Sequence, residues 1–233
     1  MDTLRRGSRG FKVSYLQRLL NKALTRDHAS GARLAEDGEF GPATDAALRA
    51  FQHRHPPSET DGSGAAGHRT WNALGLRTEH EHARVIQFGQ PTNMTCWSAA
   101  ATSIFGDRSV GPGRAVLLSD GSMQTTIDNL GVFARGLGWT MLNYSPAVQN
   151  LIALCQRTPL WIAGTGAHFA HAVVLSGVYS DGSDDGTMFR IHDPWPVGRG
   201  RIYGTFCNPV SILADDNHSR LTLLFFYVLV PNA

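Results

Sequence analysis

The spacing of apolar residues changes from a helical period to a strand period near residue 160. Upstream of this point apolar side chains recur every three or four residues, as at Val13, Leu16 and Leu20, and form one face of a helix. Downstream, short apolar and β-branched runs are separated by turns. Helices followed by a mostly antiparallel sheet are typical of an α+β fold. We expect helices over 12–25, 42–53, 69–74, 96–105, 122–136 and 146–157, and strands over 160–164, 171–179, 188–195, 201–206 and 221–230.

Length and charge limit the classes of function. The chain has 233 residues, of which 42% are hydrophobic, enough for two modest domains or one large one. The formal net charge is +2 and no block of like charge occurs, which argues against a nucleic-acid partner. The longest apolar run, Leu221–Val230, is too short to span a bilayer. No apolar stretch follows residues 1–6, so we expect a protein made in the cytoplasm without a signal peptide and exported by a leaderless route. We also expect a monomer.

Two Asp-Gly turns, at 37–38 and 61–62, divide the first part of the chain. Each turn precedes a helix that carries a threonine near its start, Thr44 in one case and Thr70 in the other. Pro42 suits the first turn of the earlier of these helices. We expect that helix to bury Ala43, Ala46, Ala47, Ala50 and Phe51.

This repeated pattern resembles the peptidoglycan-binding domain of bacterial cell-wall hydrolases over about residues 3–76. The resemblance implies a small three-helix module with peptidoglycan as its partner. It also implies domains at 1–76 and 88–233, joined by a linker at 77–87 that runs into a first strand. The residues that carry the likeness are Leu4, Gly7, Gly10, Val13, Leu16, Gln17, Leu20, Asp37, Gly38, Phe40, Gly41, Pro42, Thr44, Ala47, Leu48, Phe51, Gln52, Asp61, Gly62, Thr70, Trp71 and Leu74.

Several histidines in and after this module raise the question of a metal site. They lack cysteine partners and the His-Glu-x-x-His spacing that would make a metal site specific. We therefore interpret them as solvated surface histidines and expect no metal and no cofactor. They are His53, His55, His68, His80 and His82.

Cys96 stands where a loop ends and a helix rich in small residues begins. A helix N-terminus carries a positive partial charge, which favours a thiolate. Gln90, six residues earlier, has a side-chain amide that can donate to an oxyanion formed beside the sulfur. Cys96 is therefore a candidate nucleophile. The other two cysteines, Cys155 and Cys207, are interpreted as core residues, because an odd and widely spaced set is no disulfide framework.

A thiol that attacks a carbonyl needs a base, and the base needs an orienting group. His171 opens one predicted strand, and Asp193 lies near the end of the strand that a turn around residue 182 joins to it. The two residues are equally far from the turn, so antiparallel pairing places them at the same edge of the sheet. We therefore predict that His171 is the base and Asp193 the orienting acid.

The set resembles the papain-like cysteine peptidases over about residues 85–233. Gln90 and Cys96 match the family's oxyanion glutamine and nucleophile, His171 its histidine and Asp193 its orienting residue. Aspartate replaces the asparagine of the plant enzymes, a variant found in bacterial papain-like effectors. Their skeleton of Cys-Trp, His-Ala-Val and Asp-Pro is the closest likeness.

Other residues compete for these roles. His168 lies in a glycine-rich loop and is a rival base, while His192 points away from Asp193 by strand alternation. The turn acids Asp181, Asp184 and Asp185 are typical of turn chemistry. We expect Trp97, Trp161 and Trp195 to serve packing rather than a substrate platform, with Trp195 able to shield the contact between His171 and Asp193.

The resulting hypothesis is a cysteine peptidase or amidase that cleaves peptide-type bonds in the bacterial cell wall. Fold-level analogy suggests an antibacterial effector injected into a rival cell, with a cognate immunity protein or a secretion-system component as further partners. The alternative is a protease that cleaves a protein in the target cell, with the wall-binding module used for delivery. Acyl transfer and a non-catalytic wall-binding role are smaller possibilities.

Overall fold

The computed structural model describes residues 1–28, 31–107, 109–142, 144, 146–165, 170–208, 211–212 and 225–232. The chain forms two compact units, one made of Met1–Glu79 with Tyr179–Met188 and the other of His80–Val178 with Phe189–Ala233. Helices and an antiparallel sheet are both present, so the predicted α+β class is confirmed. In the part of the chain that the structure describes, no helix is both long and apolar enough to cross a membrane.

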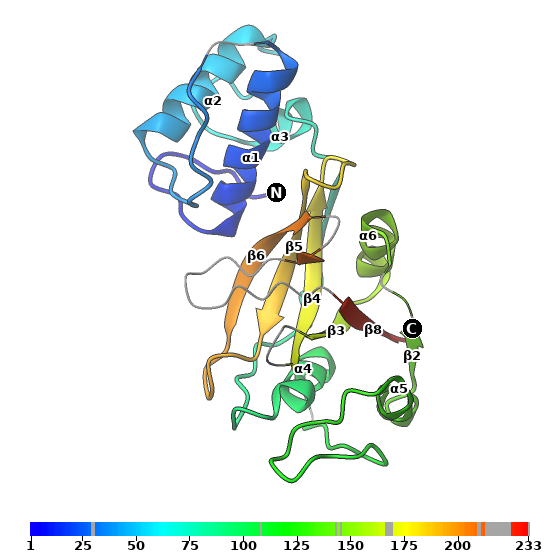
Figure 1. Cartoon of the computed structure of the whole chain (residues 1–233). Helices are drawn as coiled ribbons and strands as arrows, with labels where there is room; N and C mark the ends of the chain where they lie inside the picture. The colour runs from blue at the N-terminus through cyan, green and yellow to red at the C-terminus, as the bar shows by residue number, and fades with distance from the viewer. Residues whose placement is uncertain are drawn as a thin grey trace. The chain divides into compact units, whose positions relative to one another are not determined.

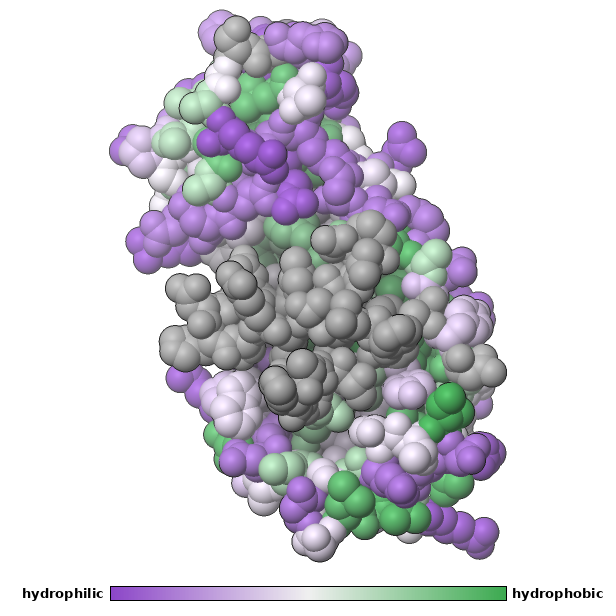
Figure 2. All heavy atoms as spheres, in the orientation of Figure 1, coloured by the Kyte–Doolittle hydropathy of each residue, from purple (hydrophilic) through white to green (hydrophobic). Residues whose placement is uncertain are grey.

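The first unit contains a three-helix module, shown in blue and cyan in Figure 1. Its helices are α1 (Phe11–Arg26), α2 (Pro42–Arg54) and α3 (His68–Ala73), and each begins and ends within one residue of its prediction. Leu16, Leu48, Phe51 and Trp71 are almost fully buried and form its core. On the face drawn in Figure 2, hydrophilic residues predominate over this module.

The buried face of α2 differs from the prediction. Its buried residues are Thr44, Leu48, Phe51 and Gln52. Phe51 was expected there, but Ala43, Ala46 and Ala50 are exposed and Ala47 is half-buried. The reason is that an alanine methyl buries little apolar area, so the larger side chains of Leu48 and Phe51 decide how the helix turns toward the core.

A buried glutamine on one helix binds the threonine of the next helix, and this arrangement occurs twice. The amide of Gln17 donates to Oγ1 of Thr44 at 3.1 Å, and the amide of Gln52 donates to Oγ1 of Thr70 at 3.1 Å. Each glutamine also accepts a hydrogen bond, at 3.0 Å, from a backbone N–H of the intervening turn region. The repeated Asp-Gly turns and threonines therefore belong to one repeated polar network that joins successive helices.

Among the described residues, eight strands form one sheet in the order β2-β8-β3-β4-β5-β6-β7, with β1 paired to β4 beside this path. The pairs of β8 with β2 and with β3, and of β3 with β4, are antiparallel. The strands are β1 (Thr78–Glu81), β2 (Trp139–Leu142), β3 (Leu160–Thr165), β4 (Ala170–Ser180), β5 (Thr187–Asp193), β6 (Arg201–Asn208), β7 (Ser211–Ile212) and β8 (Phe225–Pro231).

Helices of the second unit pack on both faces of the sheet. The helices are α4 (Cys96–Phe105), α5 (Ile127–Gly136) and α6 (Val148–Arg157). Side chains alternate along β3, so Trp161 and Ala163 share a core with α4 and α5, whereas Leu160 and Ile162 share a core with α6. Helices thus cover both faces of the sheet at β3.

Several predicted elements differ from the structure. The segment 77–87, expected as a linker, contains β1. The helix expected over 122–136 begins only at Ile127, because Thr126 caps it by accepting the N–H of Asn129 at 3.3 Å. Strand β5 ends at Asp193 rather than at residue 195, and β2 was not predicted. Residues 221–224 of the last predicted strand lie outside the described residues.

Candidate active site

Cys96 is the first residue of α4, directly after the N-cap residue Thr95. Its side chain is buried, with 9% of its surface exposed. Trp161 on β3 donates its indole N–H to the backbone carbonyl of Trp97 at 3.1 Å and so fixes the first turn of the helix against the sheet. The first N–H groups of an α-helix have no partner within the helix, so they are free to act on a group beside Cys96.

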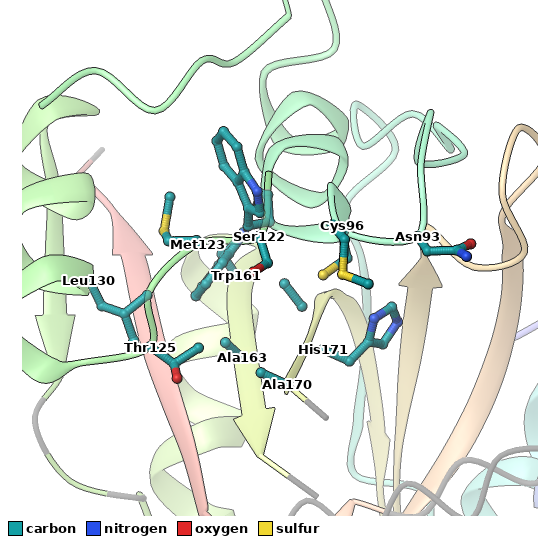
Figure 3. A pocket seen from close by; sticks show the side chains of 13 residues that line it. Asn93, Cys96, Ser122, Met123, Thr125, Leu130, Trp161, Ala163, Ala170 and His171 are labelled. Carbon is teal, nitrogen blue, oxygen red and sulfur yellow. Dashed lines mark hydrogen bonds between the residues drawn. The ribbon is translucent and has the colours of Figure 1, made fainter. Parts of the chain in front are cut away.

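His171 and Asp193 form a short hydrogen bond, as the hairpin register predicted. Nε2 of His171 lies 2.6 Å from Oδ1 of Asp193, whose side chain is fully buried. Nδ1 of His171 therefore remains for a contact other than Asp193, and Cys96 lines the same pocket and lies close enough to the imidazole to raise its pKa. Figure 3 shows Cys96 at the start of its helix with the His171 ring beside it.

Burial and charge act in opposite directions on His171. Burial alone lowers its pKa, but the interactions of the imidazole with Asp193 and Cys96 outweigh this effect and raise the pKa to about 9. The imidazole is therefore protonated at neutral pH. A protonated imidazole beside a thiol favours the thiolate form of that thiol.

Asp193 remains ionised although it is buried. Burial raises its pKa, but the hydrogen bond and charge of His171, the N–H of Trp195 and the charge of Arg201 outweigh that effect and hold the pKa below its ordinary value. The Trp195 N–H donates to Oδ1 at 2.9 Å, and Arg201 and Tyr203 approach Oδ2. Arg201 and Tyr203 were not predicted as parts of the site.

Gln90 is buried in the loop before α4. The loop is tied to the segment after β5, because the Gln90 N–H donates to the carbonyl of Pro194 at 3.0 Å and Gly198 donates to the carbonyl of Gln90 at 2.8 Å. One side-chain N–H of Gln90 donates to the carbonyl of Thr92 at 2.7 Å, and its Oε1 has no hydrogen-bond partner. A second amide proton of Gln90 remains for another acceptor.

A pocket of about 60 Å³ opens beside Cys96 and His171. In Figure 3, Met123, Leu130 and Thr125 lie across the pocket from His171. Its walls are largely apolar. Asn93, which the sequence analysis did not single out, carries a polar amide at its rim; its position three residues before Cys96 was the available signal. The lining residues are Asn93, Met94, Cys96, Trp97, Ser122, Met123, Thr125, Leu130, Trp161, Ala163, Ala170, His171 and Ala172.

The other histidines and cysteines considered for catalysis are either buried away from the pocket or outside the described residues. His168 lies outside the described residues. His192 is buried, and neither ring nitrogen has a hydrogen-bond partner. Cys155 and Cys207 are buried, as expected for core residues. Burial raises the pKa of Cys155 to about 12, so this thiol is protonated at neutral pH.

The tryptophans divide into two kinds. Trp97 and Trp161 are buried, as predicted. Trp195 differs from them, because 41% of its surface is exposed and it is not part of the core. Trp195 follows directly after the turn residue Pro194, beyond the end of β5, so the sheet no longer covers it. Its contribution to Asp193 comes from the backbone N–H.

The histidines considered for metal binding have other contacts. His82 donates through Nε2 to the carbonyl of Cys155 at 2.6 Å, and Nδ1 of His55 lies 2.9 Å from the carbonyl of Phe51. Across the described residues, no group of three or more His, Cys, Asp or Glu side chains is placed to hold a metal ion.

With this geometry in hand, comparison with protein families identifies the class. The family described as papain-like cysteine protease AvrRpt2 matches residues 79–206, more than half of the chain, so the chain belongs to this family. A peptidoglycan binding domain matches residues 9–74. The protein is thus a papain-like cysteine peptidase with an N-terminal peptidoglycan-binding domain.

Individual relatives add a partial likeness. The crystal structure of Burkholderia AP3 phage endolysin is 45% identical to this chain over the matched part, with a TM-score of 0.26. The match covers 31% of this chain and 24% of the endolysin chain, so it spans about a quarter of the endolysin's length. No curated protein matches this chain.

Proposed function

We propose that the enzyme hydrolyses peptide-type amide bonds of bacterial peptidoglycan, with Cys96, His171 and Asp193 as its triad. The observation that carries the proposal is the hydrogen-bonded pair of His171 and Asp193 beside Cys96, in a chain that also contains a peptidoglycan-binding domain. A module held on the wall raises the local concentration of wall substrate around the peptidase.

The reaction runs in two halves. The Cys96 thiolate attacks the substrate carbonyl carbon, and the protonated His171 gives its proton to the departing amine as the amide C–N bond breaks. A thioester to Cys96 remains. His171, now neutral, takes a proton from water as the water attacks the thioester, and the carboxylic acid leaves while the thiolate returns. Asp193 holds the ring throughout by its contact with Nε2.

The oxyanion of each tetrahedral intermediate needs donors beside the sulfur. The backbone N–H of Cys96 at the start of α4 is one, because a first-turn N–H has no partner within the helix. The remaining amide proton of Gln90 is the second. Its other amide proton already binds the Thr92 carbonyl, which restricts the orientation of the group.

The proposal extends to biological role and organisation. A module covering residues 1–76 retains the enzyme at the wall, and residues 88–233 perform the chemistry. A peptidase that damages cell wall suits an antibacterial effector, exported to act in the wall or periplasm of a target bacterium and opposed in its producer by an immunity protein. The combination of a wall-binding domain with a peptidase domain supports this role.

A test compares the wild type with Cys96→Ala on purified peptidoglycan, with soluble fragments analysed by mass. The matched control is Cys155→Ala, which removes a buried thiol that is absent from the pocket lining. We expect fragments with new amino termini from the wild type and from Cys155→Ala, and none from Cys96→Ala. Fragments from Cys96→Ala would refute the nucleophile, and intact peptidoglycan with every protein would refute the substrate.

Exposed apolar side chains favour a second substrate class, a protein. Phe88, Met94 and Trp195 are 37%, 39% and 41% exposed, on the two loops that the Gln90 and Pro194 backbones tie together beside the site. Apolar side chains in this place suit an extended polypeptide with apolar residues. Cleavage of an unfolded protein such as casein, together with intact peptidoglycan, would support this alternative.

A further inference from the structure

The two carboxylate oxygens of Asp193 face different groups. Oδ1 accepts from Nε2 of His171 at 2.6 Å and from the Trp195 backbone N–H at 2.9 Å. Oδ2 accepts from Nε and Nη2 of Arg201, each at 3.3 Å, and from the hydroxyl of Tyr203 at 3.5 Å. One oxygen therefore binds the proposed base, and the other binds a permanent cation.

Arg201 is held in this position by its surroundings. It is the first residue of β6, and its guanidinium carbon lies 4.9 Å from the centre of the Tyr203 ring, within the range of a cation–π contact. Only 26% of its side chain is exposed. Burial raises the pKa of Tyr203, and the charge of Asp193 adds to that effect, so the phenol stays protonated and donates.

Charge balance explains why an arginine belongs here. A fully buried aspartate carries a whole negative charge, whereas an asparagine in the same place carries none. With His171 as the sole cation beside it, Asp193 would hold the imidazole in its protonated form more strongly. The Arg201 guanidinium offsets part of the negative charge of the Asp193 carboxylate. It therefore lowers the pKa of the His171 imidazolium, which releases its proton more readily.

We propose that Arg201 is a positioning residue that fixes the second oxygen of Asp193 and, through its charge, sets the pH range in which the Cys96–His171 pair is reactive. This role rests on the triad of the proposed function. The pair consists of Cys96 on α4 and His171 on β4. The titratable and charged groups around it are Asp193 on β5 and, behind Asp193, Arg201 and Tyr203 on β6.

The test measures alkylation of Cys96 by iodoacetate across pH. This anionic reagent reacts fastest while thiolate and imidazolium coexist, so the rate rises as the thiolate forms and falls as His171 loses its proton. Peptide mass assigns the modified cysteine. No peptidoglycan is needed, so failure of wall cleavage and failure of the role of Arg201 give different results.

Removal of the positive charge in Arg201→Gln should move both limbs of the profile about one pH unit to higher pH, because a nearby cation favours the thiolate and disfavours the imidazolium. Arg201→Lys keeps the charge and should keep the profile in place. Tyr203→Phe removes a neutral donor from the same oxygen and should also leave the limbs where they are.

A lower rate in Arg201→Gln with unmoved limbs would show a merely structural residue and overturn the proposal. A pH profile of Arg201→Lys that is displaced as far as the one expected for Arg201→Gln would also overturn the proposal. If thermal unfolding shows that Arg201→Gln does not fold, the profile of Arg201→Lys decides by itself. A wild type whose Cys96 reacts only in the alkaline range of an ordinary thiol would refute the ion pair, and with it this role of Arg201.

Discussion

Replacement of Asp193 by asparagine tests the interaction on which the proposed catalytic pair depends. Asparagine keeps the shape of the side chain and removes its charge. If its oxygen stays toward His171 and Trp195, its amide N–H groups face the N–H groups of Arg201, where no hydrogen bond forms. If the amide is flipped, its N–H groups face Nε2 of His171. Either way, the protonated imidazole loses its anionic partner.

The expected magnitude follows from the contact. The pKa of His171 is raised to about 9 from its ordinary 6.5, against the effect of burial, by its interactions with Asp193 and Cys96. A hydrogen bond to a charged group contributes about 1.5–3 kcal/mol, which corresponds to about one to two pH units. We expect the pKa of His171 in Asp193→Asn to fall by about that amount, since Cys96 still supports the protonated ring.

Nitrogen-15 shifts of the imidazole rings, followed as pH rises, measure this directly. The His171 signal is assigned by its disappearance in His171→Gln. The sign is opposite to that expected for Arg201→Gln, which removes a cation rather than an anion. A His171 pKa that is the same in Asp193→Asn as in the wild type would refute the argument that Asp193 holds the imidazolium.

Three further predictions concern stability and the two domains. Burial lowers the pKa of His192 to about 4, so the unfolded chain binds its proton first as pH falls below 6.5. The unfolding free energy of the wild type relative to His192→Leu should then drop by about 2 to 3 kcal/mol between neutral pH and about pH 4.5, measured by urea titration. A constant difference would contradict this. Trp161→Phe removes the 3.1 Å bond to the Trp97 carbonyl and part of a buried ring, so urea unfolding should show a loss of about 2 kcal/mol. Gln52→Leu leaves buried hydrogen-bonding groups of the module without partners, so cosedimentation with peptidoglycan should weaken while iodoacetate still modifies Cys96 at the wild-type rate; an unchanged cosedimentation would show that this network is dispensable.

Much of the site was predictable because its determinants are local. A helix beginning at Cys96 follows from the small residues after it, and α4 begins there. The pairing of His171 with Asp193 follows from their equal distance from one turn, since a hairpin fixes its own register. The helices of the module were also predicted closely, because their apolar spacing is regular over many residues.

Other features depend on what the folded chain places around them. The orientation of α2 was predicted from its alanines, but competition with Leu48 and Phe51 for the core exposes most of them. Strand β2 is four residues long and is paired only through β8, so its short sequence carries little signal. Trp195 is a large apolar residue, and only the end of β5 before it explains why it is exposed.

The α+β class, the two kinds of domain and the candidate residues Cys96, His171 and Asp193 follow from the sequence, because each depends on periodicity, a motif or a single turn. The tertiary structure alone decided what surrounds them. Arg201 and Tyr203 reach Asp193 only because β6 packs beside β5 in the sheet, a placement that no local pattern specifies. A buried charge is balanced by whatever the fold brings to it, and that partner is found by geometry rather than by spacing along the chain.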